Sequence, residues 1–285
     1  MSSIPPPSEF SWLGPVRAPR IWTGLWQLSS SAWGSADVED IKSNLRRLVD
    51  NKYYFFDMPT TTVLLRTSLV NFVMKSQIRV KCSSQQNEAV KARLRDLQTT
   101  RIDLLQFHWQ DYNDKGYLDA LHHLQAFQEA GYISNIGLCN FDTKRTDEIC
   151  TILGPGAIVS NQVGFSLIDT RPLHGMGDVC AKHGVKLLTY GTLCGNFLTD
   201  KWLGKPLPDP YGEGNALTPS QRKARNPHSD AQLPAVLNSV WSVSRCDLDI
   251  MGYMGALPVL VESLAYNWRP ARGKEHSQHR DALGA

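Results

Sequence analysis

The chain has 285 residues and a mass of 31.9 kDa, which is the size of one large domain or two small ones. It is 42% hydrophobic and 20% charged, so it can bury a sizeable core and does not belong to the disordered class. Its formal net charge of +3 is too small for the basic footprint of a nucleic-acid-binding or anionic-membrane-binding protein. No stretch approaches the roughly 18 apolar residues of a membrane span.

The first 20 residues contain the run SIPPPSEF, whose prolines predict a flexible N-terminal arm. They lack a charged segment followed by an apolar one, so no secretory signal is expected. The 6 cysteines are scattered, and no pair has the C-x-x-C spacing of a zinc site. We therefore expect reduced thiols in a cytoplasmic protein without a metal.

From residue 21 onward, short apolar runs alternate with amphipathic segments. The apolar runs predict strands, and the amphipathic segments predict helices. The predicted strands are 21–28, 53–58, 78–82, 102–109, 133–141, 157–166 and 185–193. The predicted helices follow Asp37, cover 87–98 and 117–131, start at Asp142 or Thr143, and cover 173–184.

Continuous apolar strands predict a parallel sheet that is covered on both faces, either an open doubly wound sheet or a (β/α)8 barrel. A doubly wound dinucleotide fold should show G-x-G-x-x-G after its first strand, but SSSAWG follows it here. Polar residues instead end several strands, as barrel enzymes require. They are Asp57, Lys81, His108, Asn140 and Gln162. We therefore predict an α/β fold of the TIM-type (β/α)8 barrel class, incomplete at its C-terminal end.

Three of these residues, Asp57, Lys81 and His108, form a candidate catalytic group. Each alone has a plain structural interpretation, because a strand-end aspartate or histidine is often a hydrogen-bonded core group and a single lysine is usually solvated. At one barrel mouth, a carboxylate would pair with the ammonium, which lowers the pKa of a neighbouring acid. Such a group suits general acid catalysis on a carbonyl.

The motifs at the strand ends resemble those of the aldo/keto reductase family, in that family's order. They are GLWQL (24–28), FFDM (55–58), RIDLLQFHWQDY (101–112), ISNIGLCNFD (133–142), VSNQVGFSLIDTRP (159–172) and VKLLTYGTLCGNFLTDKW (185–202). The resemblance covers residues 20–223, apart from a break at 59–80. It implies a (β/α)8 barrel that reduces aldehydes or ketones with NADPH and without a metal.

The family's catalytic set is an aspartate, a tyrosine, a lysine and a histidine. Asp57, Lys81 and His108 match three of these, whereas Thr62 stands where the proton-donating tyrosine belongs. A threonine hydroxyl is far less acidic than a phenol and too short to replace it. If the native chain proves to have ordinary activity, another residue must deliver the proton, and Tyr53 and Tyr54 are the nearest tyrosines in sequence.

For the NADP cofactor, the resemblance implies that Asn140 and Gln162 hold the nicotinamide carboxamide and that Tyr190 stacks on the ring. Taken alone, Tyr190 would be an ordinary buried strand tyrosine. Residues 191–196 would line the pyrophosphate. The predicted cofactor-binding residues are Gly24, Asp57, Cys139, Asn140, Gln162, Tyr190, Gly191, Thr192 and Leu193.

The chain departs from the family at 59–77 and after about residue 223, where the basic motif for the NADP 2′-phosphate does not occur. A back-translation of 59–72 read two bases later can give Asp-His-Tyr-Gly, the family's tyrosine motif. We therefore hypothesise a truncated, frameshifted or mis-spliced chain, which sequencing of the transcript would test. It would comprise the N-terminal arm (1–20), a barrel (21–223) and an atypical tail (224–285), with the eighth strand absent or improvised from the tail.

The predicted function is NADP-dependent reduction of a small aldehyde or ketone, with impaired activity. Fold-level analogy adds a role in tailoring secondary metabolites. The alternative is an inactive relative that acts as a nucleotide-binding or interaction protein, or a decayed gene product. A metal or thiol enzyme is disfavoured, because adjacent His122 and His123 cannot share one helix face and Cys139 and Cys194 have no evident base. The partner is a small carbonyl compound, and the oligomeric state is left open.

Overall fold

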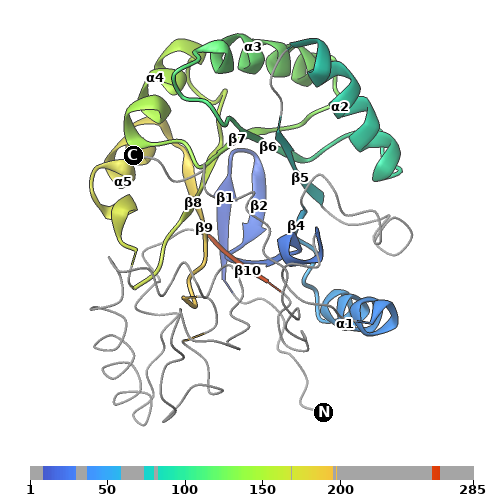
Figure 1. Ribbon diagram of the computed structural model, residues 1–285. Coiled ribbons are helices and arrows are strands. Elements are labelled where there is room, and N and C mark those ends of the chain that lie inside the picture. Colours follow the sequence, from blue (N-terminus) through green and yellow to red (C-terminus); the bar gives the residue numbers. More distant parts are fainter. Residues whose placement is uncertain are drawn as a thin grey trace, which may run out of the picture.

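Eight parallel strands form a closed ring in the computed structural model of the chain (Figure 1). The structure describes residues 9–29, 37–58, 74–79, 83–167, 169–194, 197 and 259–263. In ring order the strands are β3 (Ile21–Gly24), β4 (Phe56–Met58), β5 (Met74–Arg79), β6 (Leu104–His108), β7 (Ile136–Cys139), β8 (Ser160–Gly164), β9 (Lys186–Tyr190) and β10 (Val259–Ser263). The predicted (β/α)8 barrel is confirmed.

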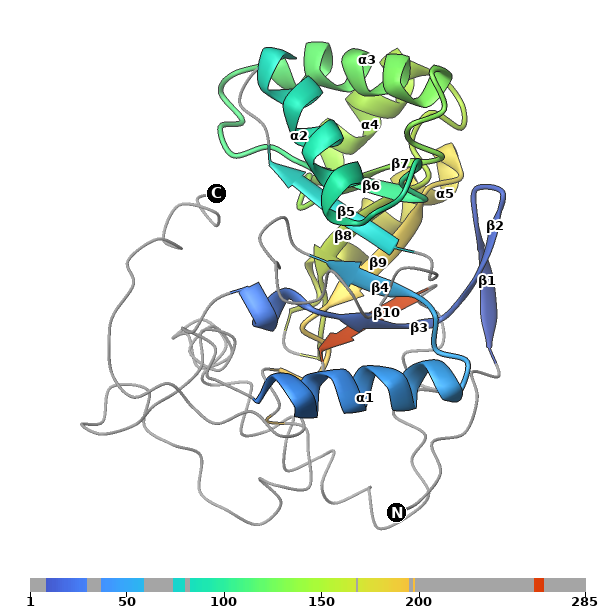
Figure 2. The same cartoon turned by 90° about the vertical axis from the view of Figure 1, so that its right-hand side faces the viewer.

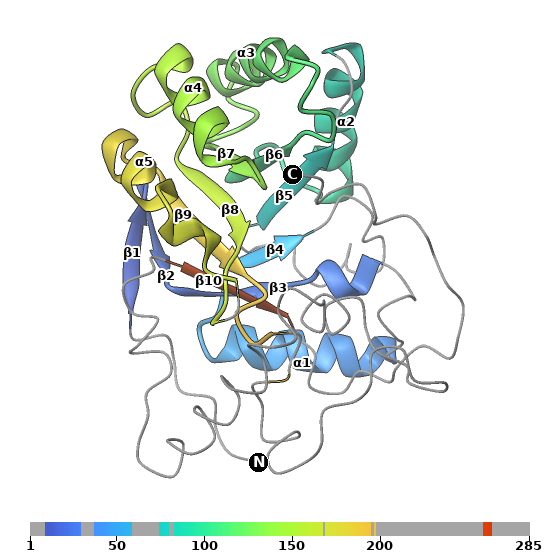
Figure 3. The same ribbon diagram turned by 60° about the vertical axis from the view of Figure 1, so that its left-hand side comes forward.

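The expectation of an incomplete barrel is corrected by β10, which lies between β9 and β3 (Figure 3). Leu260 is paired with Thr189 on one side and with Ile21 on the other. Of the two alternatives for the eighth strand, the structure has the one supplied by the tail. The short apolar run around Leu260 supplies the strand, and pairing on both sides leaves no open edge in the ring.

The third strand of the barrel begins earlier than predicted. The apolar run favoured a strand at 78–82, whereas β5 covers Met74–Arg79. The ladder with β6 explains the difference, because it pairs five successive residues, from Lys75 with Leu104 to Arg79 with His108. Backbone pairing with both neighbours, rather than apolar content, thus determines the bounds of this strand.

Part of the predicted N-terminal arm is an ordered β-hairpin of β1 (Phe10–Leu13) and β2 (Val16–Pro19), which corrects the expectation of flexibility for these residues. The hairpin lies at the end of the barrel where the strands begin (Figure 2). Leu13 and Ala18 are buried there against Trp22 and Val159. The hairpin closes this end, so the opposite end is left to carry a site.

Helices α1 (Val38–Asp50), α2 (Ser83–Asp96), α3 (Gly116–Glu129), α4 (Thr143–Leu153) and α5 (Met176–His183) surround the ring, with short 3₁₀ helices η1 (Trp26–Ser29) and η4 (Arg171–Leu173). The side chain of Asp37 accepts from the Glu39 N–H at 2.8 Å, as its predicted capping role requires. Asp142 caps α4 by accepting from the Arg145 N–H at 2.8 Å. Among the described residues, no helix is long and apolar enough to cross a membrane.

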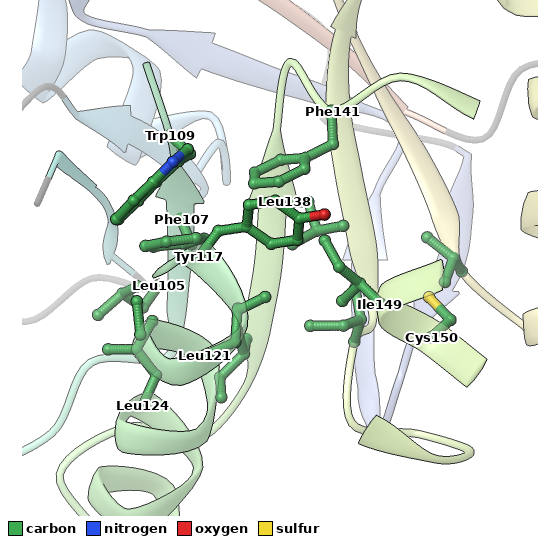
Figure 4. Packing of buried hydrophobic residues seen from close by; sticks show 14 of the residues in the cluster. Leu105, Phe107, Trp109, Tyr117, Leu121, Leu124, Leu138, Phe141, Ile149 and Cys150 are labelled. Carbon is green, nitrogen blue, oxygen red and sulfur yellow. The ribbon is translucent and has the colours of Figure 1, made fainter. Parts of the chain in front are cut away.

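The main core lies between the barrel wall and the helices that cover it (Figure 4). Phe107 and Leu138 project from β6 and β7, and Leu121 and Ile149 project from α3 and α4; all four are fully buried. Full burial of such a side chain contributes about 1.5–3 kcal/mol. This packing fixes the strands whose last residues are His108 and Cys139.

Gly137 in β7 is expected to tolerate no side chain. A Cβ there would lie 2.3 Å from Oγ of Ser160 on β8, so Gly137→Ala should lower the free energy of unfolding by about 1–3 kcal/mol. Gly177→Ala in α5 is the matched control, because a Cβ at Gly177 would meet only the carbonyl oxygen of Pro172, at 4.0 Å. Urea unfolding of both variants checks this; equal stability would contradict the close β7–β8 approach.

Candidate functional site

The predicted site residues lie at the carboxyl ends of neighbouring barrel strands. In the parallel ladders, Gly24 is paired with Asp57, and Cys139 is paired with both His108 and Gln162. Because the strands are parallel, these ends meet at one mouth of the barrel, opposite the β1–β2 hairpin (Figure 2). The fold therefore brings the described members of the predicted set to one place.

Asp57 is the last but one residue of β4 and is 6% exposed. Two amides hold its carboxylate: Nε2 of Gln106 donates to Oδ1 at 2.8 Å, and Nε2 of Gln162 donates to Oδ2 at 2.9 Å. One donor on each oxygen fixes the rotation of the carboxylate, and hydrogen bonds to a charged acceptor are the stronger kind. Asp57 on β4 is thus positioned by side chains from β6 and β8, two strands that are not its direct neighbours in the barrel.

Gln106 was missed by the sequence reasoning. A signal was present, because a polar residue within the apolar run LLQFHW must find a partner once it is buried. Gln106 is fully buried in β6, and its partner Asp57 lies 49 residues earlier in the chain. That partner could not be read from the spacing along one sequence.

Asn140 follows β7 in the left-handed backbone conformation, with φ 63°. Its N–H donates to the Gln162 carbonyl at 2.7 Å, its Oδ1 accepts from the Tyr190 hydroxyl at 2.8 Å, and its carbonyl accepts from the Tyr112 hydroxyl at 2.7 Å. Burial raises the pKa of Tyr190 and of Tyr112 above the usual range. Both phenols therefore remain donors at physiological pH.

The predicted pyrophosphate segment begins in a turn directly after β9. The Cys194 N–H donates to the Gly191 carbonyl at 3.0 Å, and Thr192 within the turn is buried. Gly191 has φ 76°, and no heavy atom lies within 4 Å of where a Cβ would be. The backbone of Gly191 thus borders open space directly after Tyr190, where a ligand can approach closely.

His108 is the last residue of β6 and is 5% exposed. Lys81 and Thr62 lie outside the described residues. The structure thus places Asp57 and His108 of the candidate catalytic group, and the roles of all three residues stay predictions.

Tyr53 and Tyr54 lie at the wrong end of the barrel to replace the missing tyrosine. Both precede β4, and the Tyr53 N–H donates to the Leu48 carbonyl at the end of α1. A strand rises about 3.3 Å per residue, so Tyr53 is roughly 13 Å along the chain from Asp57. This position does not favour either tyrosine as a replacement proton donor at the barrel mouth.

The described residues contain no group of three or more His, Cys, Asp or Glu side chains that could hold a metal ion. His122 and His123 are both exposed on α3. Cys139 and Cys194 are buried thiols that form no disulfide. Among the described residues, no metal-binding cluster thus competes with the barrel mouth.

Comparisons with known proteins agree with this geometry. Methylglyoxal reductase DkgA of Salmonella typhimurium is 28% identical over 155 residues, which cover 54% of this chain and 54% of that protein. The match thus spans about half the length of that curated relative. The solved glycerol dehydrogenase AKR11B4 of Gluconobacter oxydans has a TM-score of 0.73 at 16% identity and covers 90% of this chain and 86% of its own.

A solved aldo/keto reductase of Klebsiella pneumoniae, in complex with NADP and acetate, has a TM-score of 0.55 at 18% identity and covers 66% of this chain and 69% of its own. At these identities the solved structures show the fold alone. The family model of the aldo/keto reductase family matches residues 67–229, more than half of the chain. With the barrel and its strand-end residues in place, the chain belongs to the aldo/keto reductase family.

Proposed function

We propose that the chain is an NADP-dependent oxidoreductase that reduces an aldehyde or ketone of a small organic molecule. The observation that carries the proposal is the convergence of Asp57 and His108 with Asn140, Gln162 and Tyr190 at one barrel mouth. Family membership supports it, since the family uses NADP(H) and a solved neighbour is in complex with NADP.

The residues present fit the nicotinamide end of NADP. The Tyr190 hydroxyl donates to Oδ1 of Asn140. The amide nitrogen of Asn140 therefore points away from Tyr190 and can donate a hydrogen bond to a ligand. Oε1 of Gln162 is an acceptor, and it accepts a weak hydrogen bond from the Cys139 thiol at 3.8 Å. A donor and an acceptor on neighbouring strands suit a carboxamide. Asn140 and Gln162 would hold it, and Gly191 borders the open space beside them.

Bound NADPH supplies the hydride for the carbonyl carbon. In the proposed mechanism, His108 orients the carbonyl oxygen by hydrogen bonding. Asp57, held by its two amides, would pair with the Lys81 ammonium, which would in turn increase the acidity of a proton donor. Thr62 supplies no phenol for that step, so we propose impaired turnover.

The alternative is a catalytically inactive relative that binds nucleotide or another partner. Two observations favour it: Thr62 stands at the tyrosine position, and Tyr53 and Tyr54 lie at the far end of the barrel. Finer parts of the proposal are cytoplasmic location, consistent with the lack of a disulfide among the described cysteines, and a role in tailoring secondary metabolites.

NADPH absorbance during incubation with a panel of aldehydes and ketones tests the proposal. Methylglyoxal belongs in the panel because the Salmonella typhimurium relative is named a methylglyoxal reductase. We expect slow, carbonyl-dependent oxidation of NADPH. Quenching of tryptophan fluorescence by NADPH without any turnover would instead support the binding-only alternative.

A further inference from the structure

Tyr112 lies in the loop after β6 and belongs to none of the predicted site sets. Its hydroxyl donates to the backbone carbonyl of Asn140 at 2.7 Å, 28 residues further along the chain. We propose that Tyr112 is a positioning residue of the cofactor site, which holds Asn140 in the backbone conformation that the site uses. The inference rests on the proposed function, because it concerns a residue assigned there to NADP.

Asn140 has a conformation that needs support. A residue other than glycine with positive φ is uncommon, and such conformations persist only where the surroundings determine them. Asn140 donates one hydrogen bond to Gln162 on β8 and accepts another from Tyr190 on β9. Its third is accepted from Tyr112 in the loop after β6, so Tyr112 ties Asn140 to the opposite side of β7.

Tyr112 is itself held firmly enough to serve as an anchor. The Arg145 guanidinium lies 4.6 Å from the centroid of its ring, and Nη2 of Arg145 donates to the Tyr112 carbonyl at 3.1 Å. The ring packs edge-on against Phe141 at 5.5 Å. Arg145 also pairs with Asp142, the cap of α4, so Tyr112 is fixed to the helix that starts just after Asn140.

Loss of the Tyr112 hydroxyl would leave the Asn140 carbonyl without this donor. The backbone of Asn140 could then move toward a less strained conformation, and its side-chain amide would turn away from Tyr190. Because that amide is the proposed donor to the carboxamide of NADP, the affinity for NADPH should fall. The fold should be little affected, because the ring contacts of Tyr112 remain.

Tyr112→Phe removes only the hydroxyl, and Tyr117→Phe is the matched control. Tyr117 also packs edge-on against Phe141, at 5.8 Å, but its hydroxyl donates to Oε2 of Glu148 at 2.8 Å instead of to Asn140. Titration with NADPH, followed by quenching of the 8 tryptophans, measures affinity without turnover. We expect the NADPH dissociation constant to rise about three- to tenfold in Tyr112→Phe and to stay unchanged in Tyr117→Phe.

Asn140→Gly tests whether Tyr112 affects NADPH binding through Asn140. Glycine adopts positive φ freely and removes the side-chain amide, so Tyr112→Phe should change the dissociation constant by less than about twofold in that background. Hydrogen exchange of the Asn140 N–H should also be faster in Tyr112→Phe than in Tyr117→Phe without any ligand.

The outcomes separate the two proposals. If the wild-type chain binds NADPH and both tyrosine variants bind it equally well, the role of Tyr112 is overturned and the proposed function stands. If the folded wild-type chain binds no NADPH, the proposed function and the inference that rests on it both fail. If Tyr112→Phe weakens NADPH binding equally in the wild-type and Asn140→Gly backgrounds, Tyr112 does not act through Asn140, and the inference is overturned.

Discussion

Asp57→Asn is expected to lower both the stability of the barrel and the rate of carbonyl reduction. The substitution keeps the shape of the side chain but turns one acceptor oxygen into a donor that faces the amide nitrogen of Gln106 or Gln162. Loss of a hydrogen bond to a charged group costs about 1.5–3 kcal/mol. If Asp57 serves proton delivery, the rate should fall by about 10²–10⁴-fold. Urea unfolding and NADPH oxidation measure the two effects.

A second substitution separates the structural role of Asp57 from its proposed chemical role. Adding Gln106→Glu to Asp57→Asn restores a donor–acceptor pair with the carboxylate on β6 instead of β4. The double variant should recover much of the lost stability but not the rate, because the charge is displaced from its proposed partner Lys81. Recovery of the rate as well would contradict a specific role for Asp57.

Replacing the whole segment 59–77 with a stretch that contains the Asp-His-Tyr-Gly motif is expected to raise the rate of NADPH-dependent reduction. A positioned general acid typically contributes about 10²–10⁴-fold. Thr62→Tyr alone should restore little, because the hypothesis is that the entire segment is out of frame. Steady-state assays of the native chain and of the two variants check this.

The turnover number of the native chain provides the outcome that would contradict the proposed impairment at Thr62. A turnover number in the ordinary range of about 1–10³ s⁻¹ would mean that Thr62 is no lesion. A donor other than Tyr53 or Tyr54 would then have to deliver the proton, since both lie at the opposite end of the barrel.

The barrel and most of the site could be predicted because parallel strands leave two clear signals in a sequence. Their apolar runs gave the strands, and polar residues at the ends of those runs, such as Asp57 and His108, indicated one mouth. The starts of two helices could also be predicted, because a capping residue such as Asp37 or Asp142 bonds to a backbone N–H only two or three residues further on. The family match begins at residue 67, within the segment 59–77 that departs from the family's motif.

The remaining features depend on contacts between distant parts of the chain. The bounds of β5 follow from its pairing with β6, and the place of β10 follows from two neighbours that are far apart in sequence. Gln106 and Tyr112 were recognisable only as a buried glutamine and a loop tyrosine until the fold supplied Asp57 and Asn140 as their partners. Polar partners of this kind cannot be inferred from one sequence.

Calorimetric titration of the full chain with NADPH tests the central claim most directly, because it requires no turnover. The account predicts saturable binding of one NADPH per chain, weakened by Asn140→Gly. The affinity itself should be low, because one lost charge-assisted contact to the 2′-phosphate costs about 1.5–3 kcal/mol, roughly ten- to a hundredfold. A chain that is folded by circular dichroism and yet gives no saturable heat with NADPH, in the wild type as in the variant, would contradict the account.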